Sequence, residues 1–239
     1  MKKRYLFFLI LWITQLSNAQ VHELGIFAGG SNYVGDIGPT TVIRPNAFAY
    51  GLIYKYNTNP RIAYRTTLTS MRICAKDANA SNEIRQSFGN EIDKDITEIT
   101  AGIEFNFFEY NLSHWKYTST PYFIFELAVY QYKKAVSLAT SVPPEVNFNY
   151  ETERGIAIPF GIGYKSQLFD RFAFAIETRL RYTFTDDLDD GLLIKEEVLT
   201  GHPENAKFND PDTNDWYVFT GVSIVYTFGR PPCYSSKRR

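Results

Sequence analysis

The stretch AFAYGLIYKY, residues 47–56, alternates large apolar residues with small or polar ones. In an extended chain, one face of this stretch carries Phe48, Tyr50, Leu52, Tyr54 and Tyr56. Successive side chains of a β-strand point to opposite faces, so the alternation predicts a strand with one strongly apolar face. The segment Ile96–Phe107 repeats the pattern, with Glu98, Thr100, Gly102, Glu104 and Asn106 on its polar face.

Six further segments have the same length and character. They are Val21–Gly29, Ile62–Ile73, Pro121–Tyr132, Gly155–Lys165, Phe172–Phe184 and Trp216–Phe228. The connections alternate between short ones, such as Asn57–Pro60 and Phe169–Arg171, and long ones, such as 75–94, 133–154 and 185–215. Membrane barrels have short periplasmic turns and long outer loops, and their strands need about ten residues to cross a bilayer. The sequence therefore predicts an all-β fold, an eight-stranded antiparallel up-and-down transmembrane β-barrel with both termini in the periplasm.

The N-terminus has the features of an export signal. Lys2, Lys3 and Arg4 precede an apolar run over 5–13, and small residues at 17–19 form a cleavage site. The apolar run is shorter than the roughly 20 residues that a spanning helix needs. We therefore predict a signal peptide over 1–19, an outer-membrane barrel over 20–229 and a periplasmic tail over 230–239.

The composition agrees with a membrane barrel and gives no sign of nucleic-acid binding. Aromatic residues make up 16% of the chain, and barrels carry aromatic girdles at both membrane interfaces. The net charge of the full chain is −1, and removal of the three cations in the signal peptide brings it to −4. A basic surface for nucleic acid is therefore not indicated.

The alternation also predicts the interior of the barrel. If the apolar faces meet lipid, six charged residues point inward: Arg65, Glu104, Glu126, Glu177, Arg179 and Arg181. Three acids and three arginines can neutralise one another. Eight strands enclose a space that side chains can just fill. We therefore expect a filled lumen held by ion pairs rather than a conducting pore.

The sequence offers little for catalysis or cofactor binding. Of the three histidines, only His202 falls in a predicted outer loop, and no nucleophile or carboxylate pair accompanies it. The acidic runs over 186–190 and 210–215 lack the spacing of a calcium loop. The glycine-rich segment 29–38 lacks the strand-to-helix context of a phosphate loop and is typical of a sharp bend. We predict no enzyme activity, no cofactor and no metal site.

The opening strand and several later segments resemble a known family. The segment HELGIFAGGSNYVGDIG, residues 22–38, resembles the opening signature of the PorG-like outer-membrane barrels of the Bacteroidota. YKYNTNPRIAYR, EFNFFEY, TPYFIFE, IPFGIGYK, FTDDLDD and NDWYVFTGV are similar to later segments of that family, in the same order. Two positions depart from its pattern, Glu126 and Asp187. The resemblance implies a non-enzymatic subunit of the type IX protein secretion system, which is linked to gliding motility. Its partners would be the periplasmic ring lipoprotein and the second ring protein.

Contact with such partners would fall on the periplasmic turns and the tail. Our candidates are Tyr110, His114, Trp115, Tyr117, Asp170, Arg171 and Cys233. Aromatic residues dominate interface hot spots, and they equally form the headgroup girdle of a barrel, so both interpretations of the aromatic candidates stay open here.

The two cysteines and the outer loops leave further hypotheses. Cys74 is predicted near the outer rim and Cys233 in the periplasmic tail, so the two are not expected to pair. Cys233 is a candidate for a disulfide to a periplasmic partner, because that compartment is oxidising. The alternative function is a small outer-membrane transport or adhesion barrel whose outer loops bind a ligand.

Overall fold

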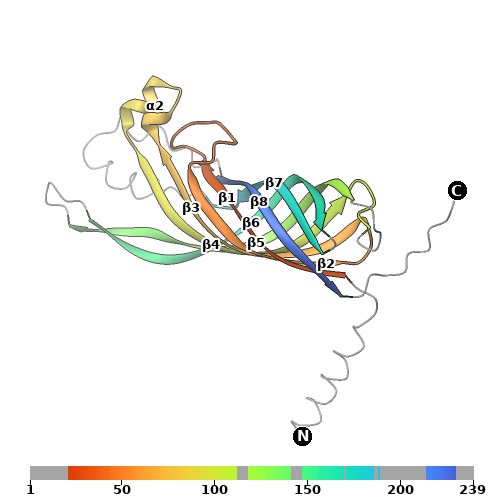
Figure 1. The fold of residues 1–239 in the computed structure, drawn as a ribbon. Helices are drawn as coiled ribbons and strands as arrows, with labels where there is room; N and C mark the ends of the chain where they lie inside the picture. The colour runs from red at the N-terminus through yellow and green to blue at the C-terminus, as the bar shows by residue number, and fades with distance from the viewer. Residues whose placement is uncertain are drawn as a thin grey trace, which may run out of the picture.

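The computed structural model describes residues 21–111, 118–140, 147–169, 171–185, 188 and 214–229, without the side chains of 84, 88, 135–140 and 147–149. Eight strands form one closed barrel in chain order, and β8 pairs with β1 (Figure 1). They are β1 Val21–Val34, β2 Ala47–Asn57, β3 Ile62–Lys76, β4 Glu91–Asn106, β5 Ser119–Thr140, β6 Asn147–Phe169, β7 Phe172–Thr183 and β8 Trp216–Gly229. All neighbours are antiparallel, which confirms the predicted eight-stranded antiparallel barrel, whereas the periplasmic position of both termini stays a prediction.

The outer faces of the strands carry large apolar side chains, whereas the interior holds charged and polar side chains together with buried apolar ones such as Phe27 and Ile53. On β4, Ile99 is 55% exposed, whereas its neighbours Glu98 and Thr100 are each 1% exposed. A soluble barrel would show the opposite arrangement, because water would meet its polar face. The same alternation of buried and exposed positions runs along β3 and β7.

The two ends of the barrel differ. We name the end with Val21 and Gly229 the inner end and the opposite end the outer end, after the orientation that the sequence predicts. At the inner end, Val21 pairs with Gly229, and short turns join β2 to β3 and β6 to β7. At the outer end lie the connection 35–46 and the 3₁₀ helix η1 Asp77–Asn79 with helix α2 Glu83–Phe88. In Figure 1 the β5–β6 hairpin also projects from this end. Among the described residues, no helix is long and apolar enough to cross a bilayer.

The strands reach further at the outer end than the sequence predicts. Residues 133–154 were expected to be a loop, but β5 and β6 continue as a paired ribbon to Thr140 and Asn147. The expected loop 75–94 likewise includes the end of β3 and the start of β4. Alternation of apolar residues stops where the apolar band ends, although the backbone hydrogen-bond ladder continues. Periodicity therefore underestimates the length of these strands.

Candidate functional site: a filled lumen between two different ends

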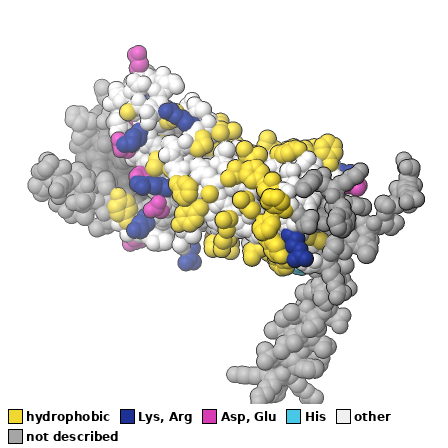
Figure 2. Space-filling model, viewed as in Figure 1, with side chains coloured by type: hydrophobic (Ala, Val, Ile, Leu, Met, Phe, Trp, Pro, Cys, Tyr) yellow, Lys and Arg dark blue, Asp and Glu magenta, His cyan; other side chains and the backbone are white. Residues whose placement is uncertain are grey.

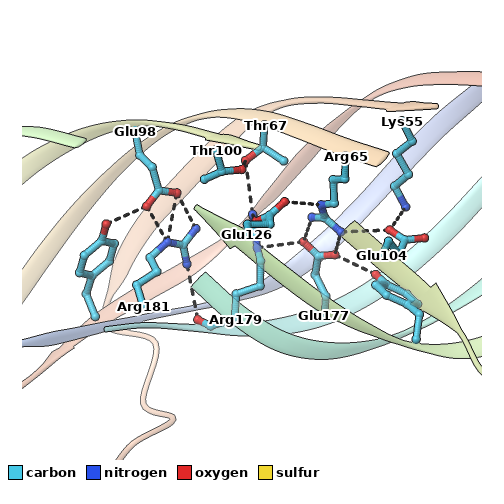
Figure 3. A network of polar contacts seen from close by, with 12 residues as sticks. Lys55, Arg65, Thr67, Glu98, Thr100, Glu104, Glu126, Glu177, Arg179 and Arg181 are labelled. Atoms are coloured by element: carbon cyan, nitrogen blue, oxygen red, sulfur yellow. Dashed lines mark hydrogen bonds and ion pairs between the residues drawn. The ribbon is translucent and has the colours of Figure 1, made fainter. Parts of the chain in front are cut away.

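The centre of the lumen is an ion network built around Arg65 of β3. Its guanidinium donates to both oxygens of Glu177 on β7, at 2.6 and 2.8 Å. It also lies 3.3 Å from Glu104 and 3.2 Å from Glu126 (Figure 3). Strands β3 and β7 do not pair, so these side chains meet across the barrel interior. A fork-shaped guanidinium suits this role because it can bind a carboxylate through two parallel bonds.

Two further arginines on β7 extend the network toward the outer end. Arg179 lies 3.2 Å from Glu177 and 3.5 Å from Glu126, and its guanidinium stacks on Phe27 and Phe219. Arg181 donates to Glu98 at 2.8 to 3.1 Å, and this carboxylate also accepts a bond from the Tyr217 hydroxyl at 2.7 Å. Aromatic rings therefore pack against both guanidinium groups, Phe27 and Phe219 against Arg179 and Tyr217 against Arg181.

Lysines complete the network toward the inner end. The ammonium of Lys55 lies 2.7 Å from Glu104, and that of Lys165 lies 2.5 Å from the same carboxylate. The structure thus brings together all six residues predicted to line the lumen and adds Lys55, Glu98 and Lys165 to them. Strand parity predicts all three: Glu98 shares the polar face of residues 96–107 with Glu104, Lys55 has the parity of the small face of β2, and Lys165 has that of Gly163.

The most deeply buried charges of the strands balance one another, and Lys94 of β4, at 8% exposure, is a further buried cation. Five cations and five glutamates are exposed by 2% or less: Lys55, Arg65, Lys165, Arg179, Arg181, Glu23, Glu98, Glu104, Glu126 and Glu177. A buried charge is costly unless it is paired, so equal numbers of both signs are what a filled lumen requires. Small residues on β6 make room for the packing, since a Cβ on Gly163 would lie 2.4 Å from the Tyr122 ring.

The predicted partner-contact residue Tyr110 is not at the surface, and this expectation is wrong. Tyr110 is 3% exposed and lies against the ammonium of Lys165, 4.2 Å from the ring centroid. Its backbone N–H donates to Pro60 at 3.0 Å, which fixes the connection after β4 beneath the lumen. Burial raises the pKa of its phenol. The ring caps the inner end because a buried lysine there offers it a cation–π contact.

Most of the other predicted functional residues lie outside the part of the chain that the structure describes. His114, Trp115, Tyr117, Asp170 and Cys233 lie outside the described residues, as do His202 and the acidic residues at 186–187, 189–190 and 210–212. Arg171 follows the β6–β7 turn and donates to the Tyr226 hydroxyl at 3.0 Å. Cys74 is a free thiol that lies 3.5 Å from Asp93, and its separation from Cys233 stays a prediction. Within the described ranges, no group of three or more His, Cys, Asp or Glu residues is placed to hold a metal ion.

An apolar belt surrounds the barrel wall. Figure 2 shows hydrophobic side chains covering its middle and inner part, with charged side chains gathered toward the outer end. In the closed wall, beyond the β5–β6 ribbon that carries Tyr150, the outward-facing apolar positions of alternate parity on β6 run from Ile156 to Leu168. At about 3.3 Å per residue and a tilt of about 40°, this stretch gives about 30 Å of height, close to the roughly 25 Å apolar band of membrane barrels. Soluble monomers rarely expose apolar patches beyond a few hundred Å².

The outer end carries folded structure of its own. Asp77 is buried, and its carboxylate accepts bonds from the backbone N–H groups of Gly38 at 2.8 Å and Asn90 at 3.1 Å. Arg85 of α2 donates to the carbonyls of Gly35 and Gly38. The connection 35–46 is thereby bound to the β3–β4 hairpin. Gly38 has φ of +83°, a conformation that glycine adopts without strain.

Comparison with known proteins identifies the family. A family model described as a domain of unknown function, DUF6089, matches residues 2–237. The chain belongs to the DUF6089 family. No curated protein matches the sequence significantly.

Solved outer-membrane barrels resemble the fold at low identity. Ail of Yersinia pestis, in complex with the heparin analogue sucrose octasulfate, is 13% identical with a TM-score of 0.46, covering 88% of this chain and all of its own. A major outer membrane protein of Thermus thermophilus is 11% identical with a TM-score of 0.47 and the same coverage. The N-terminal barrel domain of Pseudomonas aeruginosa OprF is 11% identical with a TM-score of 0.43, covering 88% and 98%. Such distant likenesses carry no function across to this DUF6089 chain.

Proposed function

We propose that this protein is a non-enzymatic outer-membrane barrel subunit of the type IX protein secretion system, linked to gliding motility. It would anchor the periplasmic ring lipoprotein and its ring partner to the outer membrane. The observation that carries the anchoring role is the lumen packed with paired charges, in which Arg65 alone joins three carboxylates. A barrel filled in this way is a rigid body rather than a conduit. The choice of secretion system rests on the sequence resemblance of residues 22–38 and the motifs that follow them.

In this proposal the inner end faces the periplasm and carries the contact surface. Among the exposed aromatic side chains in the described part of that end, Phe108 at 63% and Phe169 at 66% are the most exposed. They flank the connections in which the predicted contact residues His114, Trp115, Tyr117 and Asp170 occur. Exposed aromatics at this depth serve either a partner or the headgroup girdle, and substitution separates the two roles.

The test is affinity purification of the tagged protein from membranes in mild detergent, followed by mass spectrometry. Wild type is expected to recover the ring lipoprotein and its partner. Phe108→Ala with Phe169→Ala should lose them, because both rings lie at the inner end. Phe48→Ala is the matched control, since its ring is equally exposed at 63% but lies at the outer end, and it should retain the partners. Recovery of the barrel without any partner would refute the secretion role.

The second candidate is a small transport or adhesion barrel that binds its ligand with the outer loops. The folded outer end favours it, because Asp77 and Arg85 bind Gly35 and Gly38 of the connection 35–46 to the β3–β4 hairpin. Deletion of residues 190–213 spares Leu188 and Asp215, whose backbone-to-carboxylate bond of 3.0 Å closes the base of that loop. Secretion should survive this deletion under the first proposal, whereas ligand binding should fail under the second.

A further inference from the structure

The β5–β6 ribbon rises from the barrel wall at the outer edge of the apolar belt. The ladder between β4 and β5 ends at Thr97 with Gln131, whereas β5 stays paired with β6 as far as Thr140. Figure 1 shows this hairpin projecting beyond the closed wall. Just below the point of separation, Val129 lies opposite Ile156, and both apolar side chains are exposed. The first residues of the ribbon therefore lie at the level where a bilayer changes from acyl chains to headgroups.

Four outward-facing side chains follow this apolar pair and form what we call the donor block. Gln131 lies directly opposite Arg154, and Lys133 lies opposite Thr152. All four are exposed and share the strand parity of the apolar pair below them. Cβ atoms of opposite residues are about 5 Å apart, and diagonal neighbours are within reach of long side chains, so the four can surround one ligand group. An amide, an ammonium, a hydroxyl and a guanidinium all offer hydrogen-bond donors to it.

The donor block contains two cations and no acid. Neither Lys133 nor Arg154 forms an ion pair with the residues that the structure describes. The acids in this part of β6, Glu151 and Glu153, have the opposite parity and lie on the other face of the ribbon. Glu153 pairs there with Lys134 at 3.6 Å. The outward face of the ribbon is therefore positively charged.

Acids on β4 face the donor block across a cleft of about 580 Å³, but most of their charge is already neutralised. Glu91 lies 2.9 Å from Lys76, and Asp93 pairs with Arg72, both on β3. Asp95 lines the same cleft as the lysine of the donor block and offsets one of the two charges of the block. One positive charge remains in excess, which favours an anionic ligand.

We propose that the donor block binds the phosphate of an anionic membrane lipid, whose acyl chains lie on Val129 and Ile156. A guanidinium fork matches two phosphate oxygens, and the flexible lysine adds a second cation beside it. The remaining positive charge matches the single negative charge of a phosphodiester. A membrane lipid rather than a free anion is the ligand, because the apolar pair under the donor block is continuous with the belt that meets acyl chains. Long basic side chains near the end of a membrane span commonly extend to the headgroups.

The test uses the full mature chain in a non-ionic detergent with equal amounts of dioleoyl phosphatidylglycerol and dioleoyl phosphatidylcholine. The acyl chains are identical, so the two lipids differ only in their headgroups. Native mass spectrometry from about 0.15 M ammonium acetate, in which exposed charges are screened beyond about 8 Å, counts the lipids retained. Wild type should retain phosphatidylglycerol about three- to tenfold more often than phosphatidylcholine, which is the range of two exposed ion pairs.

Variants locate the site. Lys133→Gln/Arg154→Gln should abolish the preference, whereas Lys133→Arg/Arg154→Lys should keep it, because both charges remain. Arg72→Gln/Lys76→Gln is the matched control. It removes the same two residue types at the same end and should keep the preference, because acids on β4 already neutralise those cations.

Three results would overturn the proposal. The first is a wild type that retains both lipids equally. The second is a preference that survives Lys133→Gln/Arg154→Gln or falls equally in the Arg72→Gln/Lys76→Gln control, since net charge alone would then explain it. The third is displacement of the lipid by about 1 mM glycerol 1-phosphate, the weak end of measurable affinity, because a free phosphate would then be the ligand.

Discussion

Removal of the central arginine tests the interior most directly. Arg65→Met keeps the length and much of the volume of the side chain but leaves Glu104, Glu126 and Glu177 with one cation fewer. Arg65 makes a two-bond contact with Glu177 and approaches two more carboxylates within 3.3 Å, at a side-chain exposure of 0%. Breaking a buried pair by removing one partner costs about 3–5 kcal/mol, so we expect a loss in this range.

A double variant that removes one cation and one acid restores the charge balance of the lumen. In Arg65→Met/Glu177→Met one cation and one acid are removed together, so the double variant should be more stable than the sum of the two single losses by at least about 2 kcal/mol. Arg61→Met is the matched control. Arg61 pairs with Glu109 at 3.7 Å, and both side chains are about half or more exposed, so its loss should stay below about 1 kcal/mol.

The assay is equilibrium unfolding in urea of the barrel refolded into phospholipid vesicles, followed by tryptophan fluorescence. The assay compares the free energies of unfolding of five proteins: wild type, Arg65→Met, Glu177→Met, the double variant and Arg61→Met. A loss for Arg65→Met no greater than that for Arg61→Met would refute the reasoning. Strict additivity of Arg65→Met and Glu177→Met would also refute it, because it would mean that the two charges do not interact.

Three further predictions concern packing, the membrane and the outer end. Gly163→Ala should cost about 1–3 kcal/mol in the same unfolding assay, because the added Cβ would lie 2.4 Å from the Tyr122 ring and must displace it. Leu127→Arg should lower the free energy of unfolding in vesicles by about 2–4 kcal/mol, whereas Tyr150→Arg, at a similarly exposed position beyond the apolar band, should change it little; equal effects would contradict the membrane placement. Asp77→Asn should speed hydrogen exchange over 35–46 with little change in the barrel, because one of two backbone amides loses its carboxylate acceptor; unchanged exchange would show that the connection is held otherwise.

Much of the barrel could be predicted from alternation alone. A period of two residues gives the position of each strand and the face of each side chain, and an even number of such segments gives an up-and-down barrel. That reasoning placed Arg65 and Glu177 inside before their partners were known. It also extends to Lys55 and Lys165, whose parity is as clear as that of the arginines.

Tertiary structure alone determined which charges meet. Arg65 and Glu177 are 112 residues apart on strands that do not pair, so their contact depends on the closure and stagger of the barrel, which no local pattern records. The burial of Tyr110 and the separation of β4 from β5 depend likewise on contacts between distant segments. Alternation arises within a single strand whose two faces meet different environments, and it therefore specifies which side chains point into the lumen and which point outward. Partners across a lumen and the point at which β4 and β5 separate are properties of the closed sheet, and only the assembled barrel shows them.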